Sequence, residues 1–163
     1  MIATIAILLA GCSLDNDDEN TDGNTGGEVT AQNLAGNLTT DLRLTSGVAH
    51  NLIGALLIKD GATLTIDAGT RINALAGGTD VYILVEKGGK IIADGTADTP
   101  IVFTSNATNP QPGDWGGIIL NGKSHLSRQT GSESNSASEV NTSILYGGNV
   151  ADDNSGILNY VKI

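Results

Sequence analysis

Short runs rich in Ile, Val, Leu and Thr recur along the chain, and Gly, Asp, Asn or Pro bounds each of them. This pattern is typical of β-strands separated by turns. No stretch beyond the first dozen residues shows the sustained periodicity of an amphipathic helix. The strands predicted in this way are 55–58, 62–66, 81–85, 90–93, 101–104, 117–120 and 157–163.

Two of these strand pairs repeat with an offset of 27 residues. The run LLIKDGATLTID at 56–67 overlays ILVEKGGKIIAD at 83–94, and a Gly-Thr pair follows soon after each. A third run, IILNGK at 118–123, begins in the same way. A period in the twenties with several short strands per repeat predicts a β-solenoid, an all-β fold with aliphatic side chains stacked inward and glycines at its corners.

The segments GATLTIDAGTRI, GGKIIADGTADTPIVFTS, PGDWGGIIL and LYGGNVADDNSGILNYVKI occur in this order between residues 61 and 163. They resemble β-helical surface lipoproteins of Bacteroidetes, and the resemblance covers roughly residues 29–163. It implies a right-handed parallel β-helix of the pectin-lyase-like kind. It implies fold and location more strongly than activity.

The N-terminus predicts a lipid anchor. An apolar segment, too short to span a bilayer, leads into Leu9-Ala10-Gly11-Cys12, which has the shape of a signal peptide at residues 1–11 and its cleavage site. A cysteine at this place resembles the lipobox of bacterial lipoproteins, in which diacylglycerol is joined to the thiol and an acyl chain such as palmitate to the new amino group. The alternative is a buried free cysteine in an ordinary signal peptide; the position of Cys12 and the lack of a second cysteine for a disulfide count against it. The signal lacks the usual Lys or Arg, as it would if Met1 were not the true start.

The acidity of the chain is concentrated behind this cysteine. Residues 13–42 hold seven of the 18 acidic residues and no basic one, whereas residues 43–163 hold eleven acidic and eight basic residues, a net charge of -3. Residues 12–28 are therefore predicted to be a flexible tether. Acidic residues after the cysteine also resemble a surface-export signal, so the chain is expected in the outer membrane, facing the exterior. The alternative is that these acidic residues only form a solvated spacer. No basic stripe for nucleic acid is visible.

The predicted domain begins after the tether. Residues 29–54 are expected to cap the solenoid, and residues 55–163 to form its coils. Residues 124–154 are polar and of low complexity, which predicts an inserted loop. The chain stops inside a strand-like run, so we expect a fragment of a longer protein; the alternative is that 124–154 folds back as the second cap that a solenoid needs.

No catalytic constellation is visible in the sequence. His50 and His125 lie in no recognisable motif, and no nucleophile elbow or zinc-ligand spacing occurs. Asp67 and Asp94 occupy equivalent repeat positions, so they could form a pair of carboxylates on adjacent coils, as glycoside hydrolysis requires. Their alternative role is hydrogen bonding in turns. No clustered pair of Lys or Arg is apparent for a uronate carboxylate.

Two further positions are candidates for binding. Asp152, Asp153 and Asn154 bring oxygen ligands into a Gly turn, which suits Ca²⁺, although Asx turns use the same residues without metal. Trp115 could stack on a sugar ring, or it could instead open a strand and cover the edge of a coil. No other cofactor is predicted.

Two functions therefore remain open. The first is a lipid-anchored surface protein whose β-helix is a non-catalytic scaffold for binding a glycan or a protein. The second is the N-terminal part of a β-helical polysaccharide lyase or glycosidase.

Overall fold

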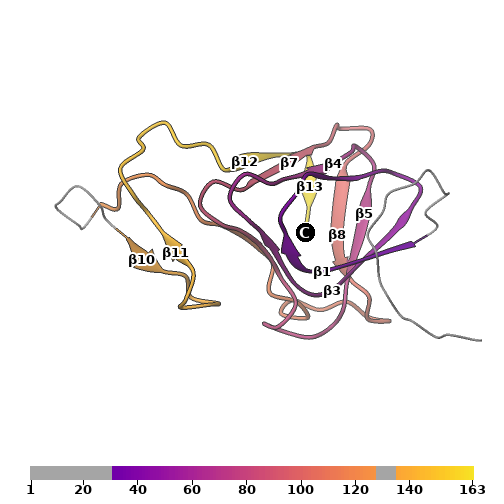
Figure 1. Cartoon of the computed structure of the whole chain (residues 1–163). Helices are drawn as coiled ribbons and strands as arrows, with labels where there is room; N and C mark the ends of the chain where they lie inside the picture. The colour runs from indigo at the N-terminus through magenta and orange to yellow at the C-terminus, as the bar shows by residue number, and fades with distance from the viewer. Residues whose placement is uncertain (1–30, 128–134) are drawn as a thin grey trace, which may run out of the picture.

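The computed structural model describes residues 31–127 and 135–163, and every regular element in these two ranges is a β-strand. The chain winds through three parallel faces in a constant order, so each strand lies beside its equivalent in the next coil. Figure 1 views the molecule nearly along the axis on which the coils stack, with β12, β7 and β4 along one side and β5 and β8 on another. The predicted parallel β-helix is confirmed.

Two of the three faces share one sheet, because its long strands turn a corner in mid-course. In β3, residues 50–52 pair with β5, whereas residues 56–58 pair with β6. The first face consists of the first halves of β1 (Ala31–Leu38) and β3 (Ala49–Ile58), with β5 (Arg71–Ala74), β8 (Ile101–Ser105) and β13 (Val161–Lys162). The second face consists of the second halves of β1 and β3, with β6 (Ile83–Val85) and β9 (Ile118–Leu120). The third face consists of β2 (Leu42–Leu44), β4 (Thr63–Ile66), β7 (Lys90–Asp94) and β12 (Gly156–Asn159).

The strand register confirms the repeat of 27 residues. Leu56 pairs with Ile83 on the second face, and Ile66 pairs with Ala93 on the third. Because both faces keep the same offset, the turn between them has the same length in both coils. The third run also takes its expected place, since Ile118 pairs with Ile83.

The core is a set of aliphatic rows that run from coil to coil. Alternate residues of the strands point inward, as the alternation of half-buried and buried positions in β4 shows. One such row on the third face consists of Leu44, Ile66 and Ala93, each no more than 2% exposed. Burying a Leu or Ile side chain stabilises a fold by about 1.5–3 kcal/mol, so these rows hold the coils together.

Among the strands of the coils, three and half of a fourth were not predicted: β1, β2, β5 and the first half of β3. Their outward positions on the first face carry Asn33, Asn51 and Asn73, which are aligned in register. Asparagine is depleted in strands, and these segments therefore look like turns in the sequence. They are strands because Leu34, Leu52 and their neighbours in register are buried in the shared core. Residues 31–52, placed in the predicted cap, thus form a complete winding.

The predicted strand at 157–163 is wrong, because two strands replace it. Tyr160 has φ 47°, a left-handed conformation that separates β12 from β13. The chain turns there from the third face to the first within one residue. The Tyr160 carbonyl accepts a hydrogen bond from the Ile101 amide at 3.1 Å, which joins the corner to the coil before it.

The insertion at 124–154 includes a small antiparallel sheet of β10 (Ser136–Ala137) and β11 (Leu145–Tyr146). Figure 1 shows these two strands beside the coils, not across their open end. The alternative of a folded-back cap over the end therefore does not describe residues 135–154. Within the described ranges, no helix has the length and apolarity needed to cross a membrane.

Candidate functional site

The insertion is packed on the outer surface of the second face. Leu84 points outward there, because its neighbours Ile83 and Val85 both belong to the core. Leu84 is nevertheless 0% exposed, and it is aligned with Leu57 and Ile119 in an outward apolar row. All three residues of β6 are buried, as in a strand that is covered on both sides.

Hydrogen bonds at one corner hold the insertion in this place. The Lys87 ammonium donates to Oδ1 of Asn135 at 2.6 Å and to the carbonyl of Gly147 at 3.2 Å. The amide of Gly147 donates to the carbonyl of Gly122 at 2.8 Å, and that of Val150 to the carbonyl of Lys123 at 3.0 Å. The turn after β9 and the side chain after β6 therefore both anchor the insertion.

Two cavities lie along the seam between the insertion and the coils. The larger, about 460 Å³, we call the groove; it is lined by Leu57, Lys59, Glu86, Lys87, Asn141, Ser143, Ile144 and Leu145. The smaller, about 210 Å³, we call the corner cavity; it is lined by Lys87, Lys123, Asn135, Gly147, Gly148, Asn149 and Val150. Lys87 borders both cavities, so the two are adjacent and together make up the candidate site.

The fold gathers three lysines that are far apart in sequence. Lys59, Lys87 and Lys123 follow the second-face strands of three successive coils, at the corner toward the third face. The sequence shows no clustered basic pair, so this expectation is corrected. Equivalent turns in stacked coils lie at the same corner of the solenoid. Which residues are equivalent depends on the strand register, and the register depends on the loop lengths.

Acidic residues neutralise part of this lysine corner. Lys59 Nζ lies 2.5 Å from Oε1 of Glu86, and these side chains are only 35% and 19% exposed. Lys123 Nζ lies 3.5 Å from Oδ1 of Asp60, whose side chain is 78% exposed. Exposed ion pairs of the second kind contribute about 0–1 kcal/mol, so the Lys123 ammonium is only loosely held.

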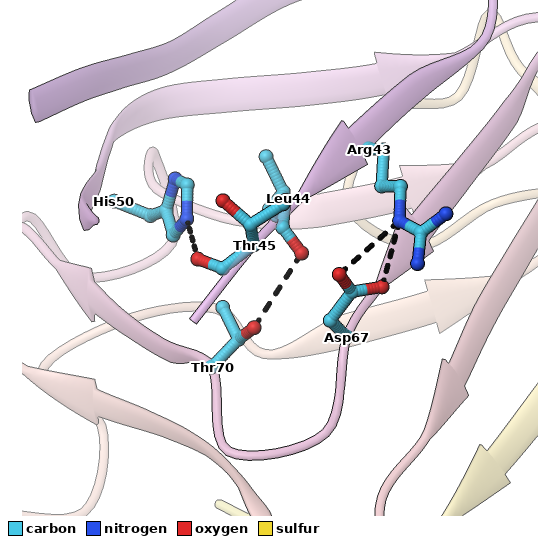
Figure 2. A network of polar contacts seen from close by, with 6 residues as sticks. All are labelled: Arg43, Leu44, Thr45, His50, Asp67 and Thr70. Atoms are coloured by element: carbon cyan, nitrogen blue, oxygen red, sulfur yellow. Dashed lines mark hydrogen bonds and ion pairs between the residues drawn. The ribbon is translucent and has the colours of Figure 1, made fainter. Parts of the chain in front are cut away.

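Asp67 and Asp94 do occupy equivalent positions on adjacent coils, as their repeat predicts. Each of them, however, has a partner in a different direction. The single Nε–H of Arg43 is shared between the two carboxylate oxygens of Asp67, at 2.9 and 3.1 Å (Figure 2), and Asp94 accepts a hydrogen bond from Nδ2 of Asn159 at 3.1 Å. These contacts link one coil to the next, a structural role that differs from the hydrogen bonding within turns given above as the alternative.

His50 lies inside the first face and is 1% exposed. Its Nε2 is 2.9 Å from the carbonyl oxygen of Thr45, and Figure 2 shows the ring turned toward that turn. Close by, the hydroxyl of Thr70 donates to the carbonyl of Leu44 at 3.4 Å. His50 is thus part of the buried corner between the third and first faces. His125 lies in the exposed segment after β9.

The calcium candidates lie in the turn that precedes β12. Oδ2 of Asp153 accepts a hydrogen bond from the Lys123 amide, 30 residues away, at 2.8 Å. Oδ1 of Asn154 accepts one from the Gly156 amide at 2.9 Å, as in an Asx turn. Asp152 is exposed. Over residues 31–127 and 135–163, His, Cys, Asp and Glu form no group of three that could hold a metal ion.

Trp115 packs on the core. Its ring stacks on that of Phe103, with 6.1 Å between centroids and 16° between the ring planes. It also forms an isolated parallel bridge with Gly78. The ring is therefore held against the core, and Trp115 lines neither the groove nor the corner cavity.

Acid is expected to loosen the loop beside Trp115. The carboxylate of Asp114 accepts a hydrogen bond from the Gln111 amide at 2.9 Å. This hydrogen bond, and to a smaller extent one from the Ser105 side chain, holds the pKa of Asp114 below its usual range. Because the pKa of Asp114 is lower in the folded protein, the ionised carboxylate stabilises the loop at pH values above the pKa of the unfolded chain, about 3.9. This stabilisation is lost as the pH falls through the lower pKa of the folded protein. Trp115 fluorescence should therefore change below about pH 4. In Asp114→Asn this step should disappear; an identical titration in both proteins would contradict it.

The predicted acylation site, Cys12, and the tether lie outside the described residues. The family model described as a pectate-lyase-like beta helix domain matches residues 36–163. No curated protein and no solved structure matches the chain. The matched range includes the coils, the insertion and both cavities, and this chain therefore belongs to the pectate-lyase-like β-helix family.

Proposed function

We propose that this protein is a surface lipoprotein whose β-helix binds a glycan chain in the groove, without catalysing a reaction. The observation that carries the proposal is the composition of the groove. Its apolar part is formed by Leu57, Ile144 and Leu145, and polar side chains of Lys59, Glu86, Asn141 and Ser143 surround it. Sugar rings present apolar faces and a rim of hydroxyls, so a mixed lining of this kind suits them.

The place of the groove supports a binding role. One wall is a β-sheet, and the other is the insertion, which carries β10 and β11. Loops that lie on a rigid scaffold commonly carry binding function. Hydrogen bonds from the Lys87 ammonium join the two walls, so the groove is preformed and little ordering is needed on binding.

The rival function is that of a polysaccharide lyase or glycosidase. The gathering of Lys59, Lys87 and Lys123 at one corner favours it, because lysines can hold and polarise an acidic sugar. Against it, Lys59 is paired with Glu86, and no carboxylate pair occurs in the lining of either cavity. The family description concerns the fold, and fold alone does not fix an activity.

One experiment separates the two functions. The protein is incubated with a panel of neutral and acidic polysaccharides, and both binding and the ultraviolet absorbance of unsaturated uronates are measured. We expect binding without a rise in absorbance. A variant with Leu57→Asp should bind at least about ten-fold more weakly, because a carboxylate then lies in the apolar part of the groove. Turnover of any polymer would instead establish the lyase.

The anchor is tested by the intact mass of the protein purified from its native membrane. We propose that the chain begins at Cys12 and carries a diacylglyceryl group and one acyl chain. Two or more chains hold a protein stably in a bilayer, at about 0.8 kcal/mol for each buried methylene. The same protein with Cys12→Ser should be released from the membrane. Surface exposure is read by protease accessibility of the tether on intact cells.

A further inference from the structure

The corner cavity has a lining unlike that of the groove. It contains two lysines and two asparagines, and no Asp or Glu contributes to it. In a chain with a net charge of -10, a lining that holds two lysines and no acidic residue is a local exception, although Asp60 pairs with the Lys123 ammonium from outside the lining. Such a cavity attracts anions, because the charges of its lining are of one sign.

Hydrogen-bond donors remain available within this cavity. A lysine ammonium has three donors, and Lys87 uses two of them, toward Asn135 and Gly147. Among residues 31–127 and 135–163, Lys123 Nζ forms an ion pair with the exposed Asp60, at 3.5 Å. The side chain of Asn149 makes no hydrogen bond to any residue of the described ranges. Three side chains can therefore donate to one ligand in the same space.

Gly88 leaves room for the ion pair of Lys123 and Asp60 beside Lys87. A Cβ at this position would lie 1.7 Å from Oδ1 of Asp60 and 2.6 Å from Nζ of Lys123, so both side chains extend over the residue that follows Lys87. Gly88 has φ +89°, and glycine adopts that conformation without strain. The close approach of Lys123 to the Lys87 backbone explains why both line one cavity.

The donor set favours a tetrahedral oxyanion over a planar carboxylate. Arginine offers a flat fork that matches a carboxylate with two parallel bonds, and no arginine lines this cavity. Lysines act as point charges, and donors that converge from several directions suit oxygens at the corners of a tetrahedron. The cavity of about 210 Å³ has room for about seven waters, which is enough for such a group and not for a polymer chain.

We propose that the corner cavity binds a sulfate or phosphate monoester carried by the glycan that lies in the groove. This inference rests on the proposed function, because the two cavities share Lys87 and one ligand is taken to occupy both. The polymer lies along the groove, and its charged substituent enters the corner cavity. The corner cavity then recognises the charged ester, and the groove recognises the sugar backbone.

The test compares a sulfated polysaccharide with the same polysaccharide after desulfation, using isothermal titration calorimetry. We expect the sulfated form to bind at least about ten-fold more tightly, and Lys123→Met to remove this preference. Lys123→Arg, which keeps the charge, should retain part of it. Competition by inorganic sulfate and by inorganic phosphate distinguishes the two esters, since the better competitor identifies the preferred one.

Lys90→Met is the matched control, because Lys90 is an exposed lysine on the third face that borders neither cavity. It removes the same charge and should leave the preference unchanged. Equal binding of the sulfated and desulfated forms would overturn the oxyanion site and leave the glycan groove intact. Absence of binding by either form would overturn both proposals. Equal losses in Lys123→Met and Lys90→Met would show attraction by overall charge only.

Discussion

Replacing Phe103 with alanine is expected to lower the free energy of unfolding by about 3–5 kcal/mol. Phe103 is the largest fully buried side chain in the core, at 1% exposed, and its ring supports Trp115 from below. The substitution leaves a cavity and also removes the stacked pair, which adds about 0.5–1.5 kcal/mol beyond burial. Denaturant unfolding followed by circular dichroism measures the loss.

A second measurement locates the effect. Trp115 is the only tryptophan, so its emission should shift to longer wavelength in Phe103→Ala as the ring gains contact with water. Val102→Ala on the same strand is the control, since Val102 is outward and only partly buried; its cost should stay near 1 kcal/mol. A loss below about 1.5 kcal/mol for Phe103→Ala would mean that this coil is not packed as described.

Replacing Gly89 with alanine is expected to destabilise the fold by about 3 kcal/mol, although it adds a single methyl group. A Cβ at Gly89 would lie 2.5 Å from the carbonyl oxygen of Ile58 and 3.0 Å from that of Lys59. Both oxygens belong to the backbone of the coil before, so neither can rotate away. The coils would have to separate at the corner, which also displaces the hydrogen bond from Glu86 N to Ile58 O, now 2.9 Å.

Gly54→Ala is the matched control for this prediction. Gly54 also lies where β3 turns a corner, but a Cβ there meets only the Cβ of Ala35 at 3.5 Å, an ordinary contact. Thermal unfolding of the two variants should therefore differ widely, with Gly54→Ala close to the parent. Similar melting temperatures for both would contradict the close stacking at Gly89.

The lysine corner and the groove explain why the fold had to be known before a site could be suggested. Lys59, Lys87 and Lys123 are separated by 28 and 36 residues, and nothing in the sequence marks them as neighbours. Their proximity follows from the register of β3, β6 and β9. The second of these spacings is longer because the connection between β7 and β8 and the connection between β8 and β9 are both longer than their equivalents one coil earlier. A sequence search for basic pairs therefore misses them.

The sequence by itself determined the all-β class, the solenoid and the 27-residue offset between two coils, because a core made of stacked identical turns repeats its inward residues in the chain. It also indicated the inserted segment by its composition. Only the tertiary structure decided which polar stretches, such as β1 and β5, are strands, since their pairing depends on burial in a shared core and not on their own propensity. It likewise decided that the insertion covers Leu84 and accepts hydrogen bonds from Lys87. Contacts between distant segments depend on loop lengths and register, and these are properties of the assembled coils.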